Sequence, residues 1–368
     1  MKNEIPTIAS ATPVAAPLAH RKGRTRGHVL VVMNRFQGYE TKVPEALQRI
    51  GYEAQWCDAR PGNGFATKVL TRLGLLQHIA PISRANVSRI AATARDCDAD
   101  TLLLISPENL RAPEMQQLRD ALPGIRILLY LWDSSGNRHL DQAMIDAADS
   151  TFSFDLDDCH SFADLCHLPL FHGHTEFPAS SDRQTDPIFD YNFVGTARIR
   201  RIKVLSGIIA QAKRADERCF FYLFAPSLLQ YVFFRVVAAC HGYSGALSRQ
   251  SLPYTVYLEI LSKSACAIDI EQEAQGGLTI RTIEAVFAGR PLATTNANVA
   301  HHDFCAHFPV SVFCPNALDI NVPRSPNTDM ARHFFDKYRI DNWLETIMSD
   351  QRARHGHNAH AAPPRCVG

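Results

Sequence analysis

Short apolar runs alternate along the chain with segments whose apolar positions recur every three to four residues. The strand-like runs cover 28–33, 53–57, 101–106, 126–132, 151–154, 191–194, 219–224, 266–270, 292–295 and 310–313. The helical patterns cover 39–50, 85–97, 113–121, 140–148, 199–213, 227–239, 253–262 and 340–348. Such an alternation predicts α/β structure in which parallel sheets are covered by helices.

A polar stretch divides the pattern into two halves. Residues 179–188 have little that could pack, and a chain of 368 residues is long enough for two hydrophobic cores. We therefore expect an N-terminal domain over 27–178, a linker over 179–188 and a C-terminal domain over 189–349. The ends, 1–26 and 350–368, lack a continuous apolar run, and we expect both to be disordered tails.

The composition is that of a soluble globular protein without an obvious charged partner. Hydrophobic residues make up 46% of the chain and the net charge is +1, which gives no argument for nucleic acid. The ten cysteines are scattered without a Cys-x-x-Cys pair, which fits a reducing cytoplasm. The run 219–240 has the length of a membrane span, but Pro226, Gln230 and Arg235 interrupt it. It predicts a strand, a turn and an amphipathic helix instead.

A glycine-rich turn after the strand at 266–270 is the strongest chemical signal in the chain. Thr279 predicts a helix cap, while Gly289 and Pro291 predict where that helix stops. A strand, a tight turn and a helix N-terminus present free N–H groups to an anion such as a phosphate. Arg281 and Glu284 are three positions apart, so they share one helix face, with a cation for phosphate and a carboxylate for ribose.

The expected donor-nucleotide site at this turn comprises Gln275, Gly276, Gly277, Leu278, Thr279, Arg281 and Glu284. The same pattern also fits an ordinary strand–turn–helix that carries an exposed ion pair.

A second turn, after the strand at 191–194, carries several basic residues. Gly195 allows a close approach of the backbone, and Arg198 lies in the expected turn itself. Cations at a helix N-terminus oppose the helix dipole, so we expect Arg198 to face a phosphate. Arg201 and Lys203 are interpreted as part of a solvated basic face.

With these residues in view, the chain resembles bacterial GT-B glycosyltransferases of the CgeB-like kind, from lipopolysaccharide and capsule biosynthesis, over about 28–348. The resemblance rests on Phe36-Gln37-Gly38-Tyr39-Glu40, Tyr130-Leu131-Trp132-Asp133-Ser134, Tyr191-Asn192-Phe193-Val194-Gly195-Thr196, the segment 277–292 and Asn342-Trp343-Leu344. It implies two Rossmann-like domains with parallel sheets that face each other across a cleft. It also implies a nucleotide-sugar bound mainly by the second domain, and a saccharide or lipid-linked acceptor bound by the first. We expect a cytoplasmic protein from the cysteine pattern. Because acceptors in such pathways are often lipid-linked, we also expect peripheral contact with the inner membrane face, through the basic tail or the 227–239 helix.

One departure from the resemblance bears on mechanism. Retaining GT-B enzymes often show two glutamates eight positions apart around this helix, and the residue eight positions before Glu284 is Gly276. Retention or inversion of stereochemistry therefore stays open. An epimerase of similar architecture and a sugar-nucleotide-binding scaffold without catalysis both stay as alternatives.

The expected chemistry needs neither a metal nor another cofactor. Asp155-Leu156-Asp157 has the letters of a metal motif, but its place in the first domain is interpreted as a solvated loop. The departing diphosphate would then be stabilised by Arg198, Arg281 and backbone N–H groups. For an inverting reaction, Asp133 is the first candidate for the general base and Glu40 the second.

Overall fold

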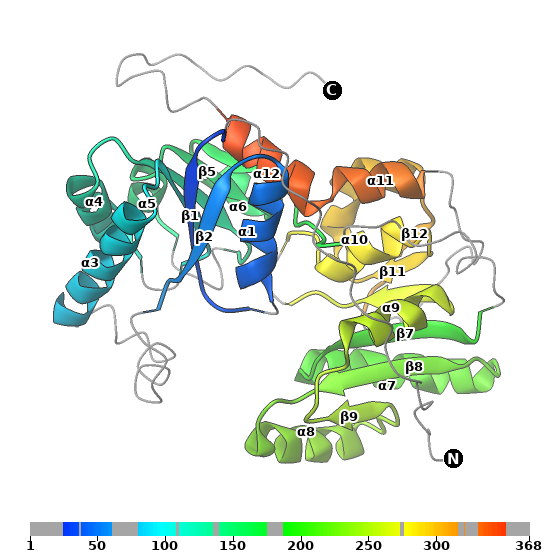
Figure 1. Cartoon of the computed structure of the whole chain (residues 1–368). Helices are drawn as coiled ribbons and strands as arrows, with labels where there is room; N and C mark the ends of the chain where they lie inside the picture. The colour runs from blue at the N-terminus through cyan, green and yellow to red at the C-terminus, as the bar shows by residue number, and fades with distance from the viewer. Residues whose placement is uncertain are drawn as a thin grey trace, which may run out of the picture.

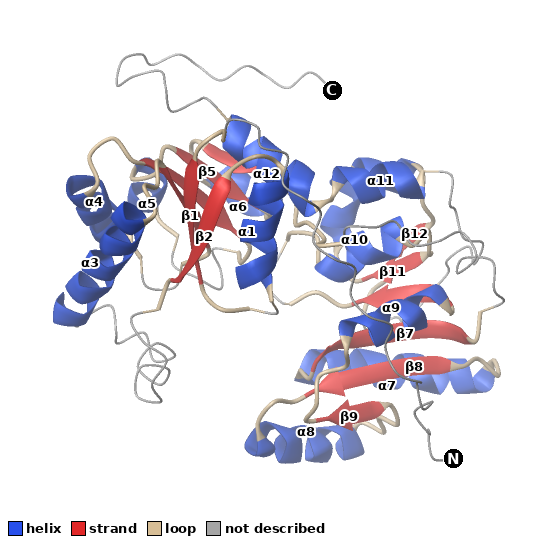
Figure 2. Cartoon of the chain, viewed as in Figure 1, coloured by secondary structure: helices blue, strands red, loops and turns tan. Residues whose placement is uncertain are grey.

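The computed structural model describes residues 25–36, 38–60, 80–107, 110–134, 140–174, 187–272, 276–315, 320 and 330–350. Within these segments the chain forms two six-stranded sheets, and all neighbouring strands in both are parallel, as the alternating pattern predicts (Figures 1 and 2). Most of the expected linker lies outside the described residues.

The N-terminal sheet has the strand order β2-β1-β3-β4-β5-β6. Its strands are β1 (His28–Met33), β2 (Glu53–Asp58), β3 (Thr101–Ile105), β4 (Arg126–Leu131), β5 (Ser150–Ser153) and β6 (Leu165–His167). The helices among them are α1 (Tyr39–Arg49), α3 (Ala80–Asp96), α4 (Ala112–Ala121), α5 (Gln142–Asp146) and α6 (Leu156–Ser161). The sequence pattern missed β6 and α6, which have only three and six residues.

The C-terminal sheet has the strand order β12-β11-β10-β7-β8-β9. Its strands are β7 (Phe189–Thr196), β8 (Cys219–Phe224), β9 (Ala246–Ser248), β10 (Ser264–Asp269), β11 (Leu292–Thr294) and β12 (Val310–Val312). The helices that follow in the chain are α7 (Ile199–Arg214), α8 (Leu228–Cys240), α9 (Tyr254–Ser262), α10 (Ile280–Phe287), α11 (Ala331–Lys337) and α12 (Ile340–Ser349), with 3-10 turns η3 (Ala297–His301) and η4 (Asp303–Ala306). Because β7 extends to Thr196, Gly195 lies in a strand and not in the turn that the sequence predicted.

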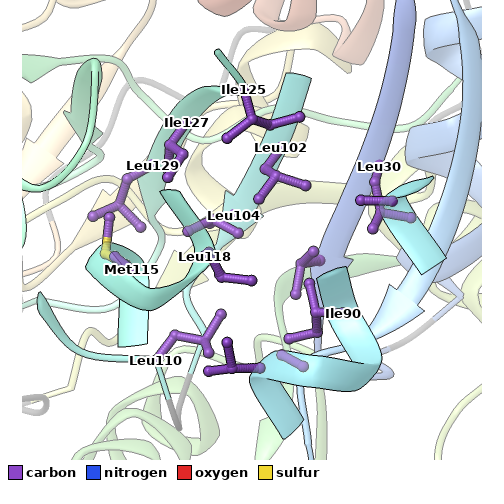
Figure 3. Close-up of a cluster of buried hydrophobic side chains, with 14 of the residues drawn as sticks. Leu30, Ile90, Leu102, Leu104, Leu110, Met115, Leu118, Ile125, Ile127 and Leu129 are labelled. Atoms are coloured by element: carbon purple, nitrogen blue, oxygen red, sulfur yellow. The ribbon is translucent and has the colours of Figure 1, made fainter. Parts of the chain in front are cut away.

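Both faces of the N-terminal sheet are covered, which explains why its central strands β1, β3 and β4 are apolar almost throughout. Side chains alternate between the faces of a strand, so Leu30 and Val32 pack under α3 and α4 in the cluster drawn in Figure 3. Val29, Val31 and Met33 face the opposite cluster, under α1. The sheet is thus held between two apolar layers.

The last helix of the described segments, α12, crosses back to the first domain. Trp343 of α12 packs against Tyr130 and Phe171, with ring centroids 4.6 and 4.1 Å away. Figure 1 shows α12 beside the N-terminal sheet, whereas the sequence division placed 340–348 in the C-terminal domain. This helix lies beside α1, and its apolar side covers the part of the same face of the N-terminal sheet that α1 leaves open.

The long apolar run at 219–240 divides into β8 and α8, as its interruptions predict. None of the helices in the described segments combines the length and the hydropathy needed to cross a lipid bilayer.

Candidate functional site at the domain boundary

The glycine-rich turn after β10 lies against the first domain. The amide of Gly276 donates to Oδ2 of Asp155 at 2.9 Å. A Cβ at Gly276 would overlap the carboxylates of Asp155 and Asp157, and a Cβ at Gly277 would overlap Phe154. The two glycines are therefore needed for the close approach of the domains. Carboxyl ends of strands from both sheets meet here, where α/β folds bind ligands.

Asp155 is buried between the two domains. The sequence analysis interpreted this residue as part of a solvated loop, and the structure corrects that interpretation. Asp155 is 1% exposed, and its side chain caps α6 by accepting the amide of Asp157 at 3.0 Å. It also accepts the hydroxyl of Ser134 and the amide of Gly276. A carboxylate that is withdrawn from water needs several such donors, and these supply them.

The helix α10 begins where the sequence predicted. Thr279 is its N-cap and accepts the amide of Thr282 at 3.3 Å, while Gly289, at a φ of 66°, follows the last turn. Leu278 is buried in the apolar cluster beneath the helix, so its side chain cannot reach a donor and only its backbone remains available. Gln275 lies outside the described residues.

Arg281 is held by a buried carboxylate that the sequence analysis did not single out. Its Nε donates to Oδ1 of Asp269 at 3.2 Å, and its Nη1 lies 3.3 Å from the carbonyl oxygen of Val194. Asp269 is completely buried at the end of β10 and also accepts hydroxyls from Thr279, Thr282 and Thr294. An ordinary strand–turn–helix with an exposed ion pair does not describe Arg281, because its carboxylate partner, Asp269, lies in the core.

The basic segment at the end of β7 lies next to Arg281. A Cβ at Gly195 would lie 3.3 Å from Nη1 of Arg281, so the two predicted donor segments are adjacent. Arg198 is exposed at the N-cap of α7, and its Nη2 lies 3.4 Å from Oε1 of Gln272. Arg201 is 5% exposed and donates to the carbonyl oxygens of Ile270 and Thr196. The prediction of a solvated Arg201 was therefore wrong. The hydrogen bonds of Arg201 connect α7 to the loop after β10.

Glu284 lies on the same helix as Arg281 and is 2% exposed. Burial raises the pKa of Glu284 to about 7, although hydrogen bonds from Tyr254 and Tyr257 and the charge of Arg281 act in the opposite direction. The hydroxyl of Tyr254 makes a short hydrogen bond to Oε1 of Glu284. A ribose that binds Glu284 must therefore replace or share this bond.

Residues of both domains surround Tyr254, and the sequence analysis singled out neither Tyr254 itself nor its neighbours Lys42 and His174. The ring of His174 stacks on Tyr254 at 5.1 Å, with its Nε2 2.6 Å from the tyrosine oxygen. Nζ of Lys42 lies 5.7 Å from the centre of the Tyr254 ring and 5.3 Å from that of Tyr39. Burial and the charge of Lys42 lower the pKa of His174 to about 4, so this histidine is neutral near pH 7. No local pattern predicts such a cluster, because its members come from α1, α9, α10 and the segment after β6.

The two candidate bases lie at the rim of the N-terminal sheet. Asp133 follows β4 and is half-buried, next to Trp132, whose ring contacts Phe36 at 5.5 Å. Glu40 accepts the amide of Phe36 at 3.2 Å and pairs with Arg35 at 3.5 Å, so it supports the start of α1. The structure brings the two segments together through these aromatic rings.

Two further histidines meet at the domain boundary. The rings of His167 and His302 are 5.6 Å apart, and neither Nε2 has a hydrogen-bond partner. Burial lowers the pKa of both, so both are neutral near pH 7. Within the described segments, no group of three or more His, Cys, Asp or Glu side chains is arranged to hold a metal ion.

Comparison with known proteins identifies the fold of this chain. No protein-family model matches the chain, and no curated protein sequence matches it. Among solved structures, the E. coli trehalose-6-phosphate structure bound with UDP-2-fluoro glucose aligns with a TM-score of 0.61 at 12% identity, over 88% of this chain and 99% of that one. A Burkholderia xenovorans α,α-trehalose-phosphate synthase (UDP-forming), in complex with glucose-6-phosphate, aligns with a TM-score of 0.59 at 12% identity, over 88% and 99%.

A third structure, the glycosyltransferase AviGT4 involved in Avilamycin A biosynthesis, aligns with a TM-score of 0.52 at 12% identity, over 89% of this chain and 97% of that one. The chain therefore has the GT-B fold, with two Rossmann-like domains built on parallel sheets, and its structural neighbours are GT-B glycosyltransferases. The fold expected from the sequence is confirmed.

Proposed function

We propose that this protein is a glycosyltransferase that moves a sugar from a nucleotide-sugar donor to a saccharide or lipid-linked acceptor. The observation that carries the proposal is the pair Arg281 and Glu284 on α10, behind a glycine-rich turn at the domain boundary. The GT-B fold of the structural neighbours supports it.

The donor would bind with its diphosphate at the N-terminus of α10. The backbone of Gly277 and Thr279 would face the phosphates together with Arg281, and Arg198 would reach them from the N-cap of α7. Asp269 holds Arg281 in position before a ligand arrives, which lowers the entropic cost of binding. Glu284 would accept the ribose hydroxyls in exchange for its bond from Tyr254.

We propose that the first domain supplies a carboxylate for the sugar. Gly276 stands where the resemblance leads one to expect a first glutamate, and no side chain fits there. An exposed carboxylate beside Gly276 is that of Asp157, whose Oδ2 lies 3.2 Å from Nδ2 of Asn298 of the second domain. Asp157 would accept sugar hydroxyls at this place.

The transfer step follows from charge. The departing diphosphate gains negative charge, which Arg281, Arg198 and the N-terminus of α10 would stabilise without a metal. If the reaction inverts, a carboxylate must take the proton of the acceptor hydroxyl. We assign this role first to Asp133, which follows β4 at the carboxyl edge of the N-terminal sheet, and Glu40 at the start of α1 is the second candidate.

The proposed biological role is the synthesis of a cell-surface polysaccharide, that is, lipopolysaccharide, capsule or exopolysaccharide. This follows from the resemblance of the sequence motifs to CgeB-like enzymes. A lipid-linked acceptor would bring the enzyme from the cytoplasm to the inner membrane face.

A panel of nucleotide-sugars tests the proposal. Purified protein is incubated with UDP-, GDP-, dTDP- and CMP-sugars, with and without saccharide acceptors, and products are separated by chromatography. We expect release of one nucleoside diphosphate or monophosphate together with a transferred or hydrolysed sugar. Interconversion of the donor sugar would instead indicate an epimerase, and binding without turnover would indicate a scaffold.

A further inference from the structure

One helix of the C-terminal domain exposes an unusual amount of apolar surface. Half of the ten large hydrophobic side chains that are exposed in the described segments lie on α8. Leu229 is 84% exposed and Val236 is 60% exposed. The five residues, hereafter the outer face of α8, are Leu228, Leu229, Val232, Phe233 and Val236. Contiguous exposed apolar patches of this kind mark interaction sites.

The opposite side of α8 is already used for packing. Tyr231, Phe234, Val237 and Ala238 lie against the core beneath the C-terminal sheet. A helix that is apolar on both sides is normally buried all round, whereas α8 is buried on one side only. The outer face is therefore not required for folding of the domain, and it is available to another surface.

The charges around α8 indicate what kind of surface could contact its outer face. Between Glu217 and Glu259 the chain has no acidic residue, but it has Arg235 and Arg249, and both are exposed. Arg235 lies at the edge of the outer face, where its Nη1 donates to the hydroxyl of Tyr231 at 3.3 Å, and Arg249 directly follows β9, the strand beside β8. Long arginine side chains can keep their charge among headgroups while the apolar side chains enter the acyl region.

We propose that α8 lies in the plane of an anionic lipid bilayer, with Leu229, Val232, Phe233 and Val236 inserted and Arg235 among the headgroups. Figure 1 places α8 at the outer edge of the C-terminal domain, away from the first domain, so membrane contact leaves the donor site open. The inference is independent of the chemistry proposed for the domain boundary. Of the two membrane contacts expected from the sequence, the basic tail and the 227–239 helix, it selects the helix and names the residues that insert.

A second copy of the chain fits this face less well. In a symmetric dimer the same patch of both chains forms the contact, so both Arg235 side chains lie in or beside it. The helix carries no acidic residue that could pair with either of them. Anionic lipid offers phosphate groups to Arg235, whereas a second α8 offers it no carboxylate.

Sedimentation with lipid vesicles tests the proposal on the full-length protein. Vesicles of phosphatidylcholine alone are compared with vesicles that also contain phosphatidylglycerol, without any nucleotide-sugar. We expect binding to the anionic vesicles, and a loss of roughly tenfold or more in apparent affinity in the double variant Leu229→Gln/Phe233→Gln. Arg235→Gln should weaken binding to anionic vesicles by about fivefold, the effect of one basic residue near such a surface.

The matched control is Val312→Gln, since Val312 is also exposed but lies in β12, at the opposite edge of the same sheet. Circular dichroism and thermal unfolding confirm that each variant is folded. The proposal is overturned if the wild type binds neither vesicle, binds both equally, or binds as well after the double substitution. It is also overturned if the wild type is a dimer that the double variant converts to a monomer. Because no donor is present, a negative result here leaves the proposed sugar transfer untouched.

Discussion

Two carboxylates of the C-terminal domain are buried close to each other, and they are held in different ways. Asp269 is surrounded by Arg281 and three threonine hydroxyls, so its oxygens are satisfied by donors. Glu284 accepts hydrogen bonds from tyrosines, and burial raises its pKa to about 7. Buried carboxylates with such partners are characteristic of functional sites.

Replacement of Arg281 tests whether it contacts the donor. Arg281→Ala should weaken nucleotide-diphosphate binding by roughly 1.5–3 kcal/mol, the scale of a hydrogen bond to a charged group. It should also destabilise the protein, because Asp269 is left buried without its cation. Calorimetry with UDP, GDP and dTDP measures the first effect and urea unfolding the second.

The control for this variant is Arg200→Ala, which removes a cation paired with Glu271 on the neighbouring loop. If folded Arg281→Ala binds the preferred nucleotide as well as the wild type does, Arg281 is structural and the donor lies elsewhere.

The protonation of Glu284 makes stability depend on pH. An unfolded glutamate releases its proton near pH 4.5, whereas folded Glu284 keeps it until about pH 7. In this window the folded state binds more protons than the unfolded state, so the free energy of unfolding falls as pH rises. The expected fall is on the order of 3 kcal/mol, and Glu284→Gln should not show it.

Urea unfolding of the wild type and of Glu284→Gln between pH 4.5 and pH 8 measures this effect. The difference between the two proteins should grow up to pH 7 and then stay constant. Parallel curves would mean that Glu284 is ionised throughout this range.

At the scale of elements, the domain boundary is formed by loops that follow strands. The turn between β10 and α10 touches the segment after β5, and Asn298 of η3 reaches Asp157 of α6. His174, after β6, reaches Tyr254 at the start of α9. Three separate hydrogen bonds thus join the carboxyl ends of the two sheets, and each is made between loop or helix-end residues of different domains.

Gly277→Ala tests the closest of these contacts. The added methyl group would overlap Phe154, so we expect a loss of about 1–3 kcal/mol in the free energy of unfolding, the usual cost of overpacking. A double-mutant cycle with Phe154→Ala isolates the contact, because removal of the ring makes room for the methyl group. Urea unfolding of the four proteins should show that the double variant is more stable than additive losses predict. Strict additivity would mean that the turn and Phe154 do not touch in solution.

At the scale of the whole molecule, the chain passes through both domains and returns to the first. Ile340 donates its amide to the carbonyl oxygen of His172 at 3.0 Å, and the amide of His172 donates to Tyr338 at 2.9 Å. The helix α12 then covers the N-terminal sheet beside α1. The N-terminal domain is therefore built from two separate stretches of the chain, whereas the elements from β7 to α11 follow one another without interruption.

Substitution of Trp343 tests this return. Because Trp343 is buried between Tyr130 and Phe171, Trp343→Ala should lower the free energy of unfolding by about 3–5 kcal/mol. The control Thr346→Ala changes an exposed position on the same helix and should cost less than about 0.5 kcal/mol. Urea unfolding, monitored by far-ultraviolet circular dichroism because the variant lacks the Trp343 signal, measures both free energies. A small effect at Trp343 would show that α12 is not packed on the first domain in solution.

The order of elements and the start of α10 could be predicted from the sequence, because both depend on neighbours along the chain. Alternating apolar segments report strands and helices, and Thr279 followed later by Gly289 reports a capped helix. The division of 219–240 into β8 and α8 is local in the same sense, since Pro226 and Ser227 mark the turn. The family resemblance then added the GT-B fold, which the solved structures confirm.

Burial and partners were decided only by the tertiary structure. Arg201 and Asp155 have the charge and the local setting of solvated residues, yet both are buried, because loops from distant strands close over them. Lys42, His174 and Tyr254 meet beside Glu284 although they are far apart in sequence. Periodicity shows which side of an element is apolar, but not which element covers it; that depends on strand order and on the return of α12 to the first domain.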